Sequence, residues 1–204
     1  MRSRSFNRSF LILVLFLISG VGATAQLLDQ HSRDTARVYR SIERALKDPD
    51  RVHVLHLKKK KLKEFPMEVL QFKNLNVLVL SNNKLREVPD ELAELEYLQE
   101  LSFGKNKLRI FPASICKLIH LKRLNLSENF IEAIPKEIGQ LKELEVLDLW
   151  SNELYFFPDE MAEMESLRWM DLSTIQINSD EQQRIAELLP QVNISFSTPC
   201  NCGY

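Results

Sequence analysis

The sequence predicts an α/β fold, a right-handed solenoid with a parallel concave β-sheet and short helical or 3₁₀ turns on its convex side. Three observations lead to this prediction. A leucine recurs every 23 residues, an asparagine and a proline recur in fixed register with it, and amphipathic segments flank the array. A fixed period of about 20 to 50 residues is typical of similar units that stack on one another.

The repeated units occupy residues 52–174. Val52 opens the register, and the same position is then filled by Leu75, Leu98, Leu121, Leu144 and Leu167. Within each unit, alternate apolar residues such as Leu78 and Leu80 would share one face of a short strand. Strands of successive units would lie side by side about 4.8 Å apart. The rest of each period supplies the crossover that parallel strands require.

Asparagines and prolines predict the corners of each unit. The asparagines follow the strands at Asn83, Asn106, Asn129 and Asn152. Stacked side-chain amides would form a ladder that satisfies backbone groups otherwise buried without partners. A proline at positions 66, 89, 112, 135 and 158 holds φ at about −65° as the outer segment starts. Apolar residues three and six positions later indicate a short turn of helix.

The first 25 residues predict a secretory signal peptide. Arg2, Arg4 and Arg8 precede the apolar run 10–18, and an A-x-A cleavage motif ends at Ala25. The run is too short to span a bilayer, which needs about 20 residues. No stable membrane anchor would therefore remain after cleavage, and the mature chain would be periplasmic or secreted. An uncleaved anchor is the alternative interpretation.

The charge of the mature chain does not favour nucleic acid as a partner. Cleavage would remove three arginines and no acidic residue, leaving 24 basic against 28 acidic side chains, a net charge of −4. Nucleic-acid binding requires a concentrated basic face. Only the run 58–61 resembles one, and four lysines at the open end of a solenoid are more simply a solvated terminus.

Both ends of the array are expected to be capped. Residues 26–51 predict an N-terminal capping helix, since Val38, Ile42, Ala45 and Leu46 share one helical face. Residues 175–204 predict a C-terminal cap made of a helix, an edge strand and a Cys-x-Cys tail. In that helix Ser179 and Gln182 would form a capping box.

The three cysteines favour no metal site. Cys116 is expected to be a small buried apolar residue. Cys200 and Cys202 could bridge only with strain, and free thiols, an intermolecular bridge or weak metal binding are the alternatives.

Residues 52–174 resemble leucine-rich repeats of the 23-residue, proline-containing kind, which are similar to the Ras-binding scaffold group. The motif is L-x-x-L-x-L-x-x-N-x-L-x-x-Φ-P, with Lys60 and Ile175 replacing the asparagine in the first and last copies. The full layout resembles small exported repeat proteins of Gram-negative bacteria. The resemblance implies binding of a protein or peptide and no catalytic activity.

Strand residues that point away from the core would form columns across the concave face. Departures from the repeat in these columns predict the partner-binding residues Val77, Val79, Arg123, Asn125, Val146, Asp148, Trp150, Trp169 and Asp171. Tryptophans are common interface anchors, which favours a protein or peptide ligand. Packing of the tryptophans along neighbouring side chains and stacking on a sugar are the alternatives.

Charged residues in the same columns carry two further expectations. Glu100 and Arg123 would face each other as a surface ion pair. Asp148 beside Asp171 would be repulsive, and Arg168 or Lys122, a basic group of the ligand, or a metal ion could relieve that repulsion.

No enzyme chemistry is predicted. The four histidines do not group with a nucleophile, no glycine loop for phosphate is present, and no cofactor is implied. The favoured function is an exported, non-catalytic module that recognises a protein or peptide on its concave face. The alternatives are a binder of cell-envelope glycans, or an intracellular signalling scaffold if the N-terminus is not a signal peptide.

Overall fold

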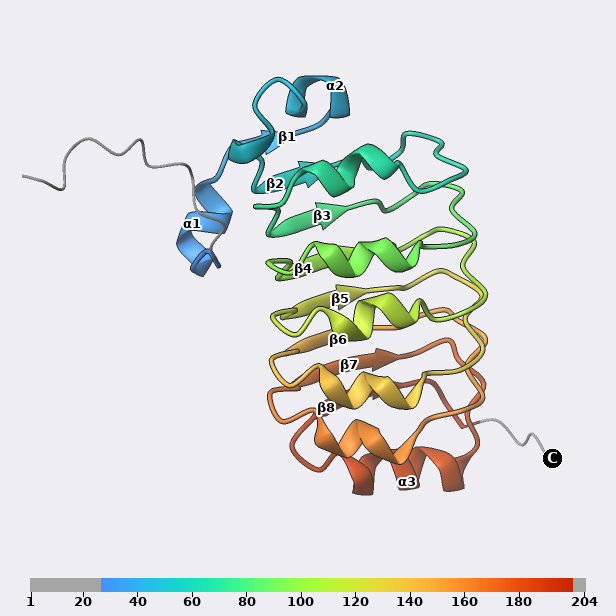
Figure 1. Cartoon of the computed structure of the whole chain (residues 1–204). Coiled ribbons are helices and arrows are strands. Elements are labelled where there is room, and N and C mark those ends of the chain that lie inside the picture. The colour runs from blue at the N-terminus through green and yellow to red at the C-terminus, as the bar shows by residue number, and fades with distance from the viewer. Residues whose placement is uncertain (1–26, 200–204) are drawn as a thin grey trace, which may run out of the picture.

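Within residues 27–199, eight parallel strands form one open sheet in the order in which they occur in the chain. The computed structural model describes residues 27–199, and in it short helices stack as a second layer over one face of this sheet (Figure 1). Each strand pairs only with strands that are adjacent in the sequence, which is the topology of a solenoid. The predicted fold class is confirmed.

The 23-residue period keeps the strands in register. The strands are β1 (Val38–Tyr39), β2 (Val54–His56), β3 (Val77–Val79), β4 (Glu100–Ser102), β5 (Arg123–Asn125), β6 (Val146–Asp148), β7 (Trp169–Leu172) and β8 (Asn193–Phe196). Leu78, Leu101, Leu124 and Leu147 are aligned partners across four of them. All four are at most 2% exposed, so this row forms the centre of the core.

The convex layer consists of five short 3₁₀ helices. They are η3 (Met67–Gln71), η4 (Asp90–Glu94), η5 (Ala113–Lys117), η6 (Lys136–Gln140) and η7 (Asp159–Glu163). Each begins directly after a proline in an extended conformation, as at Pro89 with φ −71°. The proline ring fixes φ, and the missing backbone N–H of proline costs no hydrogen bond of the helix, because the first N–H groups of a helix have no internal partner.

The corners after β3, β4, β5 and β6 each contain a left-handed residue and a buried asparagine. The residue before each ladder asparagine has positive φ, for example 58° at Lys105 and 50° at Glu128. The Asn106 amide then donates to the carbonyl oxygens of Leu80 and Phe103 at 3.1 and 2.7 Å. Its side-chain oxygen accepts the backbone N–H of Leu85 at 3.1 Å. The ladder thus ties each coil to the one before it.

The N-terminal cap differs from the single capping helix expected over residues 26–51. It consists of α1 (Gln30–Thr35), β1, α2 (Ile42–Ala45) and η2 (Pro49–Arg51). Val38, assigned to the helical face, instead pairs with Val54 in the sheet. Backbone pairing with the otherwise open edge of β2 outweighs the local helical pattern. Ile42 and Ala45 still pack on the core, as the pattern indicated.

The C-terminal cap contains the expected kinds of element, α3 (Ser179–Leu188) and then β8. The helix starts differently, however, because Asn178 is its N-cap and accepts the Glu181 N–H at 2.9 Å. Ser179 is the first helical residue, so the predicted capping box is wrong. The Gln182 amide instead donates to the carbonyl oxygens of Ile177 and Ser197, both at 3.1 Å.

The buried cysteine, the two ends of the chain and the question of a membrane-spanning helix can be treated together. Cys116 is fully buried, and burial raises the pKa of its thiol to about 12, so it packs as an apolar residue. The signal peptide predicted over residues 1–25 and the Cys200 and Cys202 tail lie outside the described residues. Within 27–199, none of the helices has the length and hydropathy needed to cross a membrane.

Candidate partner-binding site

A hollow of about 240 Å³ lies on the concave face between β3 and β7. It is lined by Val77, Val79, Glu100, Leu101, Ser102, Arg123, Leu124, Asn125, Val146, Asp148 and Trp169. Seven of the nine residues predicted to bind a partner are in this lining, and Trp150 and Asp171 are not. We call this region the concave hollow.

Strand register explains why these side chains gather. Val77, Glu100, Arg123, Val146 and Trp169 are aligned partners in one row, and Val79, Ser102, Asn125, Asp148 and Asp171 in another. Residues two positions apart on a strand point to the same face, so both rows face away from the leucine core. The rows bring apolar side chains of β3 and β6 next to polar ones of β5 and β6.

The apolar part of the site is smaller than the sequence suggested. Val77 is only 7% exposed, so it forms the floor of the concave hollow and offers little surface. Val79, Val146 and Trp169 are partly exposed. Trp150, directly after β6, is 37% exposed and stands beyond the hollow. The two tryptophans are therefore the largest accessible apolar groups of this region.

A side-chain relay holds Asp148 in place. The Asn125 amide donates to Asp148 Oδ2 at 2.5 Å, and the backbone N–H of Trp150 donates to Asp148 Oδ1 at 3.2 Å. The Asn125 oxygen in turn accepts the Ser127 hydroxyl at 3.0 Å. A Cβ at Gly104 would collide with this oxygen, so the relay requires glycine there.

Asp171, the aligned neighbour of Asp148, is held within its own turn. Its Oδ1 accepts the backbone N–H of Ser173 at 2.8 Å and the hydroxyl of Ser173 at 2.5 Å. Neither aspartate forms an ion pair with any described residue. The expectation that Arg168 or Lys122 relieves their repulsion is wrong, because neither forms an ion pair with these aspartates. The Arg168 guanidinium instead donates to the carbonyl oxygens of Glu165 and Leu167.

The electrostatics of Asp148 reflect this arrangement. Burial is the largest cause that raises the pKa of its carboxyl, and the negative charge of Asp171 adds to it. The hydrogen bond from the Trp150 N–H acts in the opposite direction without cancelling the rise. Asp148 is thus a partly buried carboxylate that a cation or an N–H donor could stabilise.

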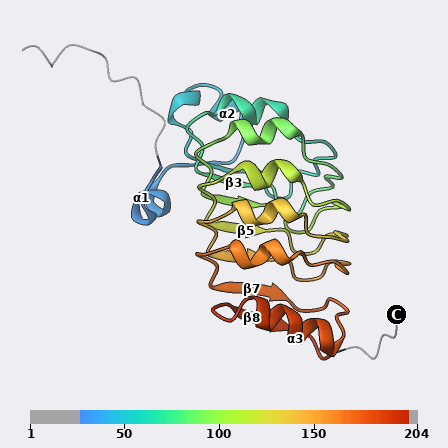
Figure 2. The same ribbon diagram turned by 60° about the horizontal axis from the view of Figure 1, so that its bottom comes forward.

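The expected surface ion pair between Glu100 and Arg123 is also wrong, because Glu100 pairs with Arg33 instead. Glu100 Oε1 lies 3.3 Å from Nε of Arg33, whose side chain is 6% exposed. Arg33 also donates to the carbonyl oxygen of Leu28 at 2.8 Å. The backbone N–H of Leu28 donates to the Gln99 side chain at 3.1 Å. The segment with α1 is therefore fastened beside β4 through Gln99 and through Glu100, which lines the concave hollow. Figure 2 shows α1 at one side of the stacked coils.

Arg33 and Gln99 were missed by the sequence analysis. Both contacts span more than 60 residues, and neither residue belongs to the repeating pattern that predicted the other columns. Because Glu100 pairs with Arg33, Arg123 forms no ion pair with any described residue, and its side chain lines the concave hollow. Residues 27–199 contain no group of three or more His, Cys, Asp or Glu side chains that could hold a metal ion.

With this geometry established, sequence comparison assigns the family. A profile described as "Leucine rich repeat" matches residues 50–118 and 119–177, and the chain belongs to this family. A search of curated protein sequences gave no significant match.

Solved structures that are similar to this chain include a bacterial leucine-rich repeat protein and a plant receptor ectodomain. A leucine-rich repeat protein of Leptospira interrogans is 32% identical with a TM-score of 0.63, over 80% of this chain and 49% of that one. The ectodomain of the plant receptor kinase GASSHO1/SCHENGEN3 of Arabidopsis thaliana, solved with Casparian strip integrity factor 2, is 30% identical. Its TM-score is 0.59, over 72% of this chain and 18% of that one.

An internalin C2 of Listeria monocytogenes shares the fold at 19% identity, with a TM-score of 0.63 over 76% of this chain and 66% of that one. The chain spans about half the length of the Leptospira protein and less than a fifth of the plant ectodomain.

Proposed function

We propose that this protein is an exported, non-catalytic recognition module that binds a protein or peptide segment on its concave face. Trp150 and Trp169 serve as apolar anchors, and Asp148 and Asp171 accept a basic side chain or N–H groups of the ligand. One observation carries the proposal: two neighbouring carboxylates without a cationic partner lie beside two accessible tryptophans.

The physical argument concerns what a ligand would supply. Like charges on adjacent strands are destabilising, and the solenoid does not need carboxylates at these positions to form its core. A lysine, arginine or terminal amine placed between Asp148 and Asp171 would remove the repulsion. Tryptophan beside it contributes contact area with little loss of side-chain entropy.

Two solved receptor structures that are similar to this chain support a peptide as the class of ligand. The GASSHO1/SCHENGEN3 ectodomain is in complex with Casparian strip integrity factor 2, and the plant peptide hormone receptor RGFR1 is in complex with RGF2. Export is supported by the basic, apolar and A-x-A pattern of residues 1–25. N-terminal sequencing of the mature protein should begin at Gln26, and a chain that retains Met1 would remove export from the proposal.

Selection from a random 12-residue peptide library on the purified protein tests the ligand class. Selected peptides should be enriched in Lys or Arg next to aromatic or aliphatic residues. Their affinity should fall at least about tenfold in Trp169→Ala and in the double variant Asp148→Asn/Asp171→Asn. Tyr155→Ala, at an exposed aromatic residue outside the concave hollow, is the control.

Equal affinity for the wild type and the concave variants would reject the concave site. Stacking on sugars predicts a different result, in which envelope oligosaccharides bind with a dependence on Trp150 and Trp169 but not on the aspartates. That outcome would replace the peptide by a glycan ligand.

A further inference from the structure

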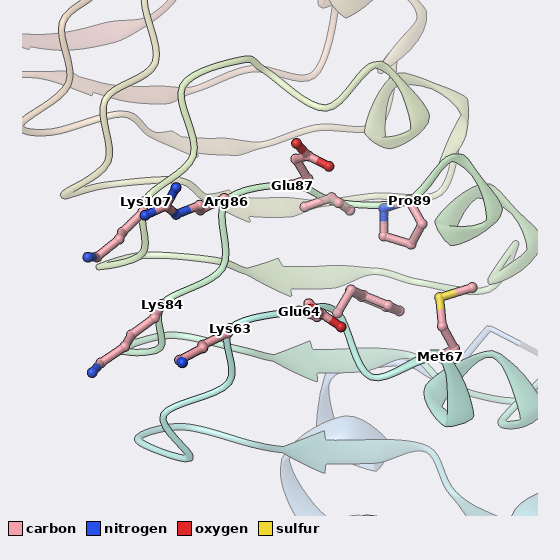
Figure 3. Close-up of a pocket in the computed structure, with 10 residues that line it drawn as sticks. Lys63, Glu64, Met67, Lys84, Arg86, Glu87, Pro89 and Lys107 are labelled. Carbon is pink, nitrogen blue, oxygen red and sulfur yellow. The ribbon is translucent and has the colours of Figure 1, made fainter.

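A second surface lies on the flank where each coil turns from the sheet towards its 3₁₀ helix. Its outward residues recur with the 23-residue period, and the first three coils place cations in two parallel rows. The first row is Lys61, Lys84 and Lys107, and the second is Lys63, Arg86 and Arg109. All six side chains are exposed. Figure 3 shows Lys63, Lys84, Arg86 and Lys107 projecting from neighbouring coils along one side of a hollow.

The rows are unusual because they stack charges of the same sign. Elsewhere in the solenoid, a cation meets an acid on the next coil, as in Lys73–Glu94, Lys105–Glu128 and Lys142–Glu163. In the described part of the chain, none of the six flank cations forms an ion pair. Equal charges on adjacent coils repel each other, so the stacking of these cations on one another does not stabilise the fold. A ligand of opposite charge would gain directly from them.

A groove runs beside the cations and has an apolar floor. Two hollows of about 740 and 780 Å³ share Arg86, Glu87, Val88 and Lys107 in their linings, so they adjoin each other along this flank. Phe65 and Phe111 contribute buried aromatic surface to the lining.

At the far end of the groove stand Ile110, 83% exposed, and Phe130, 40% exposed. The Arg109 guanidinium lies 5.9 Å from the centre of the Phe130 ring, where cation and apolar surface meet.

Three acids in the groove restrict the kind of partner. Glu64, Glu87 and Asp90 line the hollows, and Figure 3 shows Glu64 and Glu87 between the cationic rows and the convex helices. A uniformly anionic polymer or lipid surface would be repelled by all three. A polypeptide segment can instead place carboxylates over the cations and apolar side chains over Val88, Phe111 and Ile110.

We propose that this flank groove binds an extended polypeptide segment in which acidic and apolar side chains are interspersed. The groove is separate from the concave hollow, since the two share no lining residue. The module therefore has two recognition surfaces of opposite sign: the concave face accepts cationic groups and the flank accepts carboxylates.

Fluorescence anisotropy with defined peptides tests the proposal. The probe is a labelled nine-residue peptide, Gly-Glu-Leu-Glu-Phe-Glu-Leu-Glu-Gly. Gln in place of every Glu, or Ser in place of Leu and Phe, gives the two matched peptides. The probe should bind the purified protein with an affinity that decreases as salt increases. Both matched peptides should bind at least about tenfold more weakly.

Two charge-reversed proteins locate the binding. Lys84→Glu/Arg86→Glu should weaken binding of the probe at least about tenfold. Lys47→Glu/Lys117→Glu changes the net charge equally at exposed positions outside the groove, and should bind as the wild type does. The flank variant should also unfold at a temperature no lower than the wild type, because it removes repulsion. This second measurement separates a lost contact from a damaged fold.

Several results would overturn the proposal. One is a probe that fails to bind the wild type, and another is equal loss of binding in both charge-reversed proteins. A third is a Ser-substituted peptide that binds as tightly as the probe, because the apolar floor would then be unused. Vesicles of phosphatidylglycerol that bind through Lys84 and Arg86 more tightly than the peptide would assign the flank to a membrane surface.

Discussion

A buried asparagine amide at four of the corners, at positions 83, 106, 129 and 152, holds two coils together. Asn129 is 5% exposed, and its amide donates to the carbonyl oxygens of Phe103 on the preceding coil and Leu126 on its own. Its oxygen accepts the Leu108 N–H at 3.1 Å. The sequence could predict this role, because an amide side chain that recurs directly after each strand can both donate to and accept from the backbone of a buried turn.

Asn129→Ala should lower the free energy of unfolding by about 2–5 kcal/mol. The substitution leaves several buried backbone groups without partners, and each costs about 1–3 kcal/mol. Urea denaturation followed by circular dichroism measures the loss. Asn193→Ala, at an exposed position of β8, should change stability by less than about 0.5 kcal/mol. Similar losses in the two variants would contradict the structural role of the ladder.

Asp148→Asn should alter how stability depends on pH. The pKa of the Asp148 carboxyl is raised in the folded protein above its ordinary value of 3.8. Between these two pKa values the folded state binds more protons than the unfolded state. Stability contributed by this group is therefore present at low pH and is lost as pH rises through the folded pKa.

The Asp148→Asn variant should accordingly lose less stability than the wild type between about pH 4 and pH 7, as measured by urea denaturation at several pH values. Asp90→Asn changes an exposed carboxyl on the convex side and is the matched control. Parallel pH profiles for the wild type and Asp148→Asn would show that burial does not perturb this carboxyl.

The strands and helices inside the repeat array could be predicted from the sequence, whereas those in the two caps could be predicted less well. Strands β2–β7 and helices η3–η7 follow from a pattern repeated several times, so a local error in one copy is corrected by the others. β1 has two residues, too few for an alternating pattern to be recognised. Its pairing with β2 depends on an edge that exists only after the solenoid has formed.

Besides the pairing of β8 with β7, one arginine makes side-chain hydrogen bonds between the C-terminal cap and the last repeat. Arg184 on α3 donates to Asp159 Oδ1 and to the Phe157 carbonyl oxygen, both at 2.7 Å. It also makes two bonds to Glu181, at 2.8 and 2.7 Å. These carboxylates raise the pKa of the guanidinium, so it carries its charge at every relevant pH.

Arg184→Ala should loosen the C-terminal cap by about 1–2 kcal/mol, because the side chain is partly exposed and its bonds are shared with solvent. Amide hydrogen exchange should become faster in α3 while β3–β5 keep wild-type protection. Gln183→Ala removes only a bond within the helix, to Glu187, and should leave exchange unchanged. Uniformly faster exchange along the chain would refute a local clamp.

Across the whole molecule, stability depends on neighbouring coils burying each other's faces. One row of leucines crosses four coils, with Leu124 1% exposed between Leu101 and Leu147. The same regularity explains why the candidate site was only partly predictable. Register placed seven of the predicted residues in the concave hollow. It could not predict that Glu100, which also lines the hollow, pairs with Arg33, a residue 67 positions away in the chain.

Leu124→Ala should lower the free energy of unfolding by about 2–5 kcal/mol, the usual cost of a cavity at a fully packed position. Thermal unfolding followed by circular dichroism should remain a single transition at lower temperature, since the damaged coil lies in the middle of the array. Ile119→Ala, at a position 55% exposed, is the control. A loss below about 1 kcal/mol for Leu124→Ala would contradict the core register.

The left-handed corners have a practical consequence for engineering. Several residues other than glycine adopt positive φ, and all of them except Lys61 occupy the same place in successive coils of the described chain. Most side chains with a Cβ are strained in this conformation, so glycine or asparagine at Lys105, Glu128 or Ser151 would relieve backbone strain in the folded state. These turn positions belong to neither recognition surface, so they are places where the protein could be made more heat-resistant without changing what it binds.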